Sequence, residues 1–224
     1  MAPDHLATED LDSILATVVL LAPASRPDLT LEEVVPVNKS HDEAVPAGPV
    51  QRILAAAKFA AEKHAAQKRK GAAQEPYVNH LIEVAQLIAS SSEVLDTELV
   101  MAGLLHDTIE DVGATAEELE WRFGADVAAL VVEVTDDKSL PKEVRKALQV
   151  KNAPHKSARA QVIKLADKIS NLRSILASPP ATWSIERKRE YLEWARQVVE
   201  GLSSPNPTLK AEFDRTYRLF DETP

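Results

Sequence analysis

The chain contains no cysteine and only six glycines among its 224 residues, and both shortages exclude classes of site. Without cysteine there is no disulfide, no thiolate nucleophile and no sulfur-ligated metal. No glycine-rich phosphate loop and no G-x-G-x-x-G pattern occurs, so neither a P-loop nor a dinucleotide-binding fold is expected. The lack of cysteine suits a reducing compartment, and we expect a cytoplasmic protein.

Long apolar runs are also missing. The longest mainly apolar run near the N-terminus spans residues 14–23. That is far shorter than the roughly 20 residues that cross a bilayer. Acidic residues precede it, without Lys or Arg, so it lacks the basic start of a secretory signal. We therefore expect neither a membrane span nor a signal peptide, and we interpret the run as a short segment that docks on the domain or binds a partner.

The net charge of −9 is unevenly distributed along the chain. Residues 1–50 contain nine Asp or Glu, two Lys or Arg and six of the 14 prolines, whereas residues 51–224 contain 26 acidic and 24 basic residues. This change in composition predicts an acidic, proline-rich N-terminal appendage or linker over 1–50 and one globular domain over 51–224. The acidity argues against a nucleic-acid partner. The appendage is the candidate contact for a second copy of the chain or another partner.

From residue 51 onward, apolar residues recur at helical spacing, and no stretch shows the two-residue alternation of a strand. The predicted fold is all-α, a multi-helix bundle. Thr115 with Glu118 forms a capping box, and Asn206 before Pro207 is a second start signal. Four helices are expected to begin near residues 51, 96, 141 and 206. The others are expected to span residues 78–90, 115–123, 127–134, 158–176 and 184–202. The larger aromatic residues are interpreted as packing residues, namely Trp121, Trp183, Tyr191, Trp194 and Phe213.

Four residues form a candidate metal site: His80, His106, Asp107 and Asp167. Two imidazoles and two carboxylates without sulfur favour a borderline or hard divalent ion such as Mn²⁺, Fe²⁺ or Zn²⁺. Each residue alone has an ordinary alternative, because a histidine at a helix start is often a cap and Asp167 has a lysine on either side for an ion pair.

The segment 106–111 strengthens this interpretation because it concentrates four ionisable groups within two turns. If it is helical, Glu110 lies one turn after His106 and Asp111 lies one turn after Asp107. Without a cation, these carboxylates would repel one another and raise their own pKa values. A divalent ion resolves the conflict and acidifies a water molecule, which the remaining carboxylates can orient or deprotonate.

Several short sequence motifs together carry a specific resemblance to a known family. In order and spacing they resemble the HD-domain metal-dependent phosphohydrolases, and among these the hydrolase domain of RelA/SpoT-type proteins. The motifs occupy residues 63–70, 76–80, 104–111, 122–124, 134–138 and 164–173. The resemblance covers about residues 51–203 and, since synthetase and regulatory domains have no room, is closest to the stand-alone small alarmone hydrolases, including the metazoan SpoT homologues. One departure is Leu81, where the family commonly has proline.

This resemblance implies an all-α, manganese-dependent enzyme of the stringent response. It would hydrolyse guanosine 3′,5′-bis(diphosphate) (ppGpp) or its pentaphosphate to GDP or GTP and pyrophosphate. The same resemblance implies that His80, His106, Asp107 and Asp167 hold the metal and that Glu110 and Asp111 activate the water. It implies substrate contacts from Arg69 and Lys70, from Asn171 and Arg173, and from a basic rim of Lys138, Lys142, Arg145 and Lys146, for which a solvated helix face is the alternative.

Two other functions remain open at this stage. The same metal site would serve an NADPH 2′-phosphatase or another nucleotide phosphohydrolase, because both reactions attack a phosphorus bound to a ribose oxygen. A catalytically silent module that binds nucleotides or a partner is the alternative of another class. All four candidate metal ligands are present, together with Glu110 and Asp111, and this complete set argues against a silent module.

Overall fold

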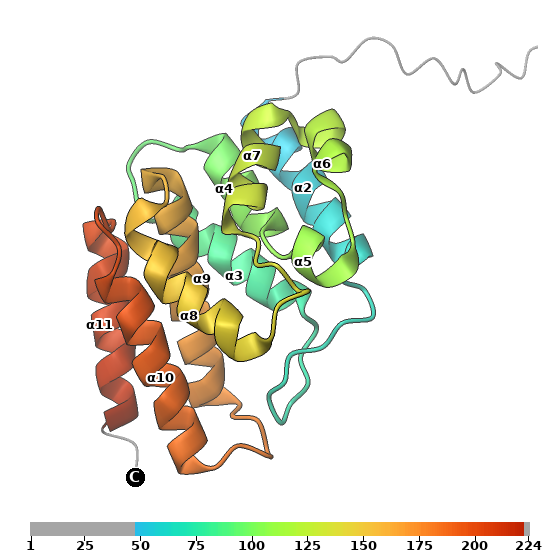
Figure 1. Cartoon of the computed structure of the whole chain (residues 1–224). Helices are drawn as coiled ribbons and strands as arrows, with labels where there is room; N and C mark the ends of the chain where they lie inside the picture. The colour runs from blue at the N-terminus through green and yellow to red at the C-terminus, as the bar shows by residue number, and fades with distance from the viewer. Residues whose placement is uncertain (1–47, 222–224) are drawn as a thin grey trace, which may run out of the picture. The chain divides into compact units, whose positions relative to one another are not determined.

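The computed structural model describes residues 48–221, and the structure is reported for this part of the chain. The predicted appendage falls almost entirely on residues 1–47, outside the described residues, so the domain boundary stays a prediction. The all-α prediction is confirmed, since residues 48–221 form helices and no strand (Figure 1). The helices are α2 (Pro49–Lys63), α3 (Val78–Ala89), α4 (Thr97–Leu105), α5 (Thr108–Val112), α6 (Ala116–Phe123), α7 (Ala125–Val134), α8 (Lys142–Asn152), η3 (Ala153–His155), α9 (Ala158–Ala177), α10 (Ile185–Glu200) and α11 (Pro207–Asp221).

Helix α4 forms the centre of the core. Eight of its nine residues are buried, and Glu98 is the exception. A helix that is apolar all round has to be enclosed by others, and α2, α3 and α7 pack against it. The Asp96 side chain caps its first turn by accepting a hydrogen bond from the Leu99 amide at 2.9 Å. The C-terminal end of α4 therefore brings His106 to the interior of the domain.

Helices α3 and α4 approach closely at Gly103. A Cβ atom at this position would lie 2.5 Å from Ile88 Cδ1 and 3.5 Å from Ala85 Cα. The missing side chain thus sets the spacing between the two helices that carry His80 and His106.

Replacing Gly103 with alanine is expected to lower the free energy of unfolding by about 1–3 kcal/mol, because the added methyl overpacks this contact. Urea denaturation measures the loss. The matched variant Ile88→Val removes the Cδ1 atom that the methyl would meet. If close packing is the cause, the double variant should be more stable than the sum of the two single losses predicts. If the losses of unfolding free energy in the two single variants simply add in the double variant, close packing is not the cause.

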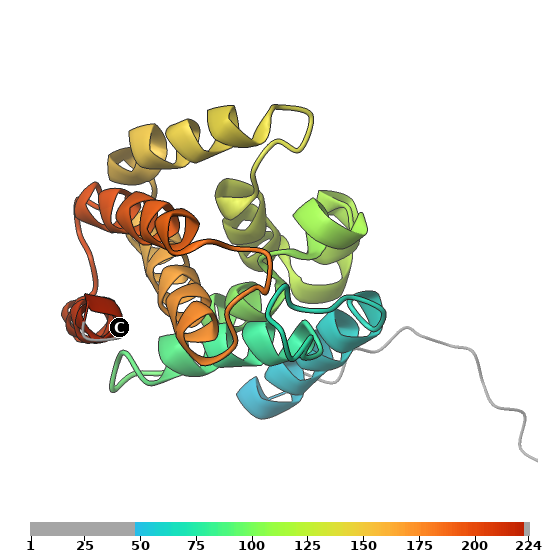
Figure 2. The ribbon, with the colours of Figure 1, turned by 90° about the horizontal axis from the view of Figure 1, so that it is seen from below.

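Helix α9 is the longest described helix and is buried along much of its length. The Ser157 side chain caps it by accepting a hydrogen bond from the Ala160 amide at 3.2 Å. It packs against α3, α7 and α10, and α11 covers its outer side (Figures 1 and 2). Helix α8 lies alongside α10 in the view of Figure 2. No helix within 48–221 has the length and hydropathy that a membrane crossing requires.

Candidate active site

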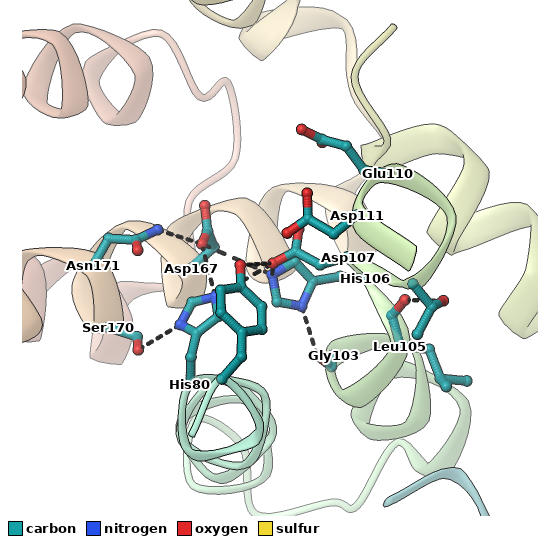
Figure 3. A network of polar contacts seen from close by, with 12 residues as sticks. His80, Gly103, Leu105, His106, Asp107, Glu110, Asp111, Asp167, Ser170 and Asn171 are labelled. Carbon is teal, nitrogen blue, oxygen red and sulfur yellow. Dashed lines mark hydrogen bonds and ion pairs between the residues drawn. The ribbon is translucent and has the colours of Figure 1, made fainter. Parts of the chain in front are cut away.

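Three separate parts of the fold bring the predicted metal ligands together (Figure 3). His80 lies in the first turn of α3, His106 and Asp107 lie between α4 and α5, and Asp167 lies midway along α9. His80 Nε2 is 3.4 Å from Asp167 Oδ1 and 3.6 Å from Asp107 Oδ2. His106 Nε2 is 3.1 Å from Asp107 Oδ2 and 3.8 Å from Asp167 Oδ1. These atoms converge on one point, as a shared ion requires.

The segment 106–111 is not one continuous helix, so the one-turn spacing considered from the sequence does not apply along its whole length. Helix α4 ends at Leu105 and α5 begins at Thr108, and Asp107 has φ −100° and ψ 0°. This sparsely populated region is common among active-site residues. The Thr108 hydroxyl donates a hydrogen bond to the Leu105 carbonyl at 2.6 Å and supports the turn. The break lets the side chains of His106 and Asp107 meet at one point.

His106 shows directly that the site suits a cation. Its Nδ1–H donates to the Gly103 carbonyl oxygen at 2.8 Å, so Nε2 is the atom that faces the carboxylates. Nε2 is buried and makes no hydrogen bond within the described part of the chain. Its polar neighbours are carboxylate oxygens of Asp107 at 3.1 Å and Asp167 at 3.8 Å, which attract a cation to this point. Two imidazole nitrogens and two carboxylates also form a donor set that divalent metal ions accept, so these residues fit a metal ion.

The charges of the cluster agree with this interpretation. Burial alone would lower the pKa of His106, but the Asp107 and Asp167 carboxylates more than offset it and raise this pKa to about 10. Burial would raise the pKa of each carboxyl, yet His106 holds that of Asp107 and Lys168 holds that of Asp167 well below the usual range. The two ionised carboxylates therefore attract either a proton or a metal ion to His106 Nε2.

Metal affinity should consequently rise with pH. Because the pKa of His106 without metal is about 10, its imidazole carries a proton at neutral pH that an incoming ion must displace. Between pH 6.5 and 8.5 the association constant for Mn²⁺ should increase by up to about tenfold per pH unit. Calorimetry of the chelator-treated protein in buffers of different ionisation enthalpy measures affinity and proton release together. An affinity independent of pH over this range would contradict the assignment of His106 as a ligand.

Other side chains fix the orientation of the two carboxylates. The Tyr77 hydroxyl donates to Asp107 Oδ2 at 2.6 Å, and burial together with Asp107 raises the pKa of this phenol. On Asp167, Oδ1 accepts a hydrogen bond from Asn171 Nδ2 at 2.6 Å and Oδ2 pairs with Lys168 Nζ at 2.9 Å. The lysine alternative for Asp167 is thus realised together with the predicted cluster.

Glu110 and Asp111 lie beside the cluster, and both are held by basic groups (Figure 3). Asp111 accepts hydrogen bonds from Gln67 Nε2 at 2.8 Å and Lys138 Nζ at 2.7 Å. Glu110 accepts from Arg145 at 3.3 Å. Burial, followed by the nearby carboxylates of Asp107 and Asp136, raises the pKa of Glu110. A carboxylate with a raised pKa is the better proton acceptor near neutral pH.

A cavity of about 510 Å³ opens next to these groups. Among the described residues that line it, ten are Lys or Arg and five are Asp or Glu. The cations are Lys68, Arg69, Lys70, Lys138, Lys142, Arg145, Lys146, Lys164, Lys168 and Arg187. Burial and two neighbouring cations, Arg187 and Lys70, lower the pKa of Lys142. This excess of positive charge suits a polyanion whose phosphates would relieve the repulsion.

Most of the predicted substrate residues line this cavity. The cavity lining includes Arg69, Lys70, Asn171 and all four residues of the predicted basic rim. Arg69 also donates a hydrogen bond to Asn171 Oδ1 at 3.2 Å, which joins the two groups of predicted contacts. Arg173 is not brought to the cavity. Its guanidinium pairs instead with Glu83 at 2.9 Å and Glu212 at 2.5 Å, because helices α3 and α11 place carboxylates beside it.

Several lining residues were not predicted. Trp183, Tyr191 and Trp194 border the cavity, although their sequence context favoured packing residues. Trp194 contacts two of the cations, since Lys168 Nζ lies 4.5 Å and Lys146 Nζ 5.0 Å from its ring centroid. Trp121 is 77% exposed, so the packing prediction is wrong for it, whereas Phe213 is in the core. The basic run at residues 187–189, between Trp183 and Tyr191, was an available signal, although acidic residues flank it.

Comparison with known proteins agrees with this geometry. The family model described as HD domain matches residues 56–193. The guanosine-3′,5′-bis(diphosphate) 3′-pyrophosphohydrolase MESH1 of Xenopus tropicalis is 48% identical over 165 residues, which cover 74% of this chain and 92% of that protein. Human MESH1 is 47% identical over 167 residues, covering 75% and 93%.

A solved structure described as a metazoan orthologue of SpoT that hydrolyses ppGpp has a TM-score of 0.73 and 43% sequence identity. The match covers 77% of this chain and 97% of that one. The site, the fold and the relatives agree along most of the described residues: the chain belongs to the HD-domain family and, within it, to the MESH1 proteins.

Proposed function

We propose that this protein hydrolyses ppGpp or the corresponding pentaphosphate to GDP or GTP and pyrophosphate, with Mn²⁺ as its metal. One observation carries this function: the cluster of His80, His106 and Asp167 lies next to a cavity whose lining has twice as many cationic residues as carboxylates. The names of the MESH1 relatives and of the similar solved structure support the same reaction.

The metal would be held by His80, His106, Asp107 and Asp167. A divalent ion bound by such residues supplies Lewis-acid chemistry: it polarises a phosphoryl oxygen and lowers the pKa of a water molecule. The nitrogen and oxygen donor set supports Mn²⁺ and also accommodates Fe²⁺ or Zn²⁺. Metal analysis of the purified protein distinguishes these ions.

Glu110 and Asp111 would have different tasks in the attack of water on the 3′-phosphorus. Glu110 is the proton acceptor, because burial and acidic neighbours raise its pKa. Asp111 is already bound by Gln67 and Lys138, so it fixes the Lys138 ammonium beside the reacting phosphate. A fixed cation at that position stabilises charge that develops on the phosphoryl oxygens.

The remaining cations would bind the substrate. Arg69 lies over the Tyr77 ring at 5.7 Å from its centroid and is tethered to Asn171, so its planar guanidinium is oriented to stack on a purine. Lys142 and Lys146, one turn apart on α8, face the cavity and would contact phosphates. Binding at two ends holds the ribose between them, with its 3′ substituent directed toward the cluster.

A substrate panel tests this function. Purified protein with Mn²⁺ should convert ppGpp to equimolar GDP and pyrophosphate, and anion-exchange chromatography separates both products. NADPH in a parallel reaction should release phosphate at a lower kcat/KM. A higher kcat/KM for NADPH would favour the 2′-phosphatase alternative. Bound Mn²⁺ without turnover of either substrate would favour the silent binding module.

Two predictions lie outside this test. A cytoplasmic location is supported by the absence of cysteine and is checked by fractionation. A role of residues 1–50 in contacting a partner or a second copy stays a prediction. Deleting these residues and measuring turnover and molar mass in solution tests it.

A further inference from the structure

A chain of hydrogen bonds extends from the metal cluster to the outside of the helical bundle. His80 Nδ1 lies 2.8 Å from Ser170 Oγ, and Ser170 Oγ donates to Glu83 Oε2 at 2.6 Å. Arg173 donates to the other carboxylate oxygen of Glu83 at 2.9 Å, and its second amino group pairs with Glu212 of α11. Figure 3 shows the inner link, with Ser170 on the side of His80 that faces away from Asp167.

The positions along the two helices explain why the contacts line up. His80 and Glu83 are three residues apart on α3, and Ser170 and Arg173 are three residues apart on α9. Residues at this spacing share a helix face, so two side chains of α3 meet two of α9. Ser170 is fully buried and His80 is 3% exposed, which removes water as an alternative partner.

The direction of these hydrogen bonds determines which nitrogen of His80 carries the proton. A serine hydroxyl has a single proton to donate, and an ionised carboxylate can only accept. Since the proton of Ser170 goes to Glu83, Ser170 Oγ is left to accept from His80 Nδ1–H. The lone pair of His80 is then on Nε2, which faces Asp107 and Asp167. Only this tautomer can bind a metal ion within the cluster.

We propose that Glu83 and Ser170 are positioning residues that hold His80 in the Nδ1–H tautomer, with Nε2 directed at the metal. Without Glu83, the Ser170 hydroxyl is free to donate to Nδ1, and Nε2 would then carry the proton and oppose the ion. Arg173 holds Glu83 in this orientation, and this role replaces the predicted substrate contact of Arg173. The inference rests on the metal site of the proposed function, but not on the identity of the substrate.

We call the chain of hydrogen bonds from Glu83 through Ser170 to His80 the relay. Measurements of metal affinity test it without an activity assay. Calorimetric titration of Mn²⁺ into chelator-treated Ser170→Ala should show binding about 10–100-fold weaker than in the native protein, as is typical when a partner of a ligand histidine is lost. Glu83→Gln should weaken binding in the same way, because its amide can donate to Ser170 and reverse the hydrogen bonds. Glu83 is only partly buried, so this variant supplies the answer if Ser170→Ala does not fold.

A matched control separates positioning from stability. Ser157→Ala removes a capping hydroxyl from the start of the same helix, ten residues before Asp167. It should lower the melting temperature and leave Mn²⁺ affinity unchanged. In the Ser170→Ala and Glu83→Gln double variant, the affinity loss should be no larger than that of the worse single variant, since both break one chain of bonds.

Native affinity in both single variants, or strictly additive losses in the double variant, would overturn the relay. Failure of the proposed function looks different. A native protein that binds Mn²⁺ and shows the expected weakening in both variants, yet leaves ppGpp intact, would retain the relay and refute the substrate. A native protein that binds no Mn²⁺ would overturn the metal site and the relay together.

Discussion

Replacing Glu110 with glutamine is expected to lower the turnover of ppGpp by about 10²–10⁴-fold while the protein still binds Mn²⁺. The change keeps the size of the side chain and most of its contact with Arg145, but it removes the atom that accepts a proton. Glu110 is not one of the four proposed metal ligands and is not in the metal-competent group of His80, His106 and Asp167, so metal affinity should stay close to native. Steady-state kinetics and calorimetry on the same preparation measure both quantities.

Glu143→Gln is the matched control, because Glu143 is an exposed carboxylate on α8 that does not line the cavity. Its activity should be near native, which would show that loss of one negative charge is not sufficient. Turnover of Glu110→Gln within a few-fold of native would exclude Glu110 as the proton acceptor. A joint loss of metal and turnover would instead move Glu110 into the ligand set.

Replacing Asp107 with alanine should remove metal binding and turnover together. Its Oδ2 lies 3.1 Å from His106 Nε2 and 3.6 Å from His80 Nε2, so the variant removes a carboxylate that lies beside both histidines of the cluster. We expect Mn²⁺ affinity to fall by more than about 100-fold, beyond the loss typical of outer-shell partners. Metal content after dialysis and the rate of pyrophosphate release measure the two losses.

Two further variants make this result specific. Asp107→Asn keeps an acceptor for the Tyr77 hydroxyl and should fold, yet it lacks the charge that attracts a metal ion. Asp126→Ala removes an exposed carboxylate that pairs with Arg159 on the protein surface and should bind Mn²⁺ normally. Retention of metal by both Asp107 variants would contradict the assignment of this residue as a ligand.

Much of the helical fold is predictable because its boundaries depend on local chemistry. Ser157 and Ser184 each cap a helix through the amide three residues later, and Asn206 accepts from the Leu209 amide in the same way. These signals require only neighbouring residues. The predicted helices over 158–176 and 184–202 therefore agree with α9 and α10 to within about two residues at each end.

The break between α4 and α5 is not predictable in this way. No glycine or proline lies within 104–111, so local rules favour a continuous helix. The turn at Asp107 is held by tertiary contacts, such as the hydrogen bond from Tyr77, thirty residues earlier in the chain. Such contacts form only when distant parts of the chain come together, so local rules do not show them.

The contacts on the substrate side of the site are also not predictable from local sequence. Helical spacing indicates that Trp194 faces inward, but not that α8 and α9 bring Lys146 and Lys168 over its ring. Arg173 is the opposite case, because a family position suggested a phosphate contact where the structure places two carboxylates. Partners 90 and 39 positions away decide its role, and a single sequence does not show them.

The most direct test of the central claim is the fate of oxygen-18 during hydrolysis of ppGpp by the native protein in labelled water with Mn²⁺. If the site directs water to the 3′-phosphorus, one labelled oxygen enters pyrophosphate, GDP stays unlabelled, and mass spectrometry shows equimolar products. Label in GDP would contradict attack at phosphorus. Absence of both products from a protein with bound metal would contradict the proposed function.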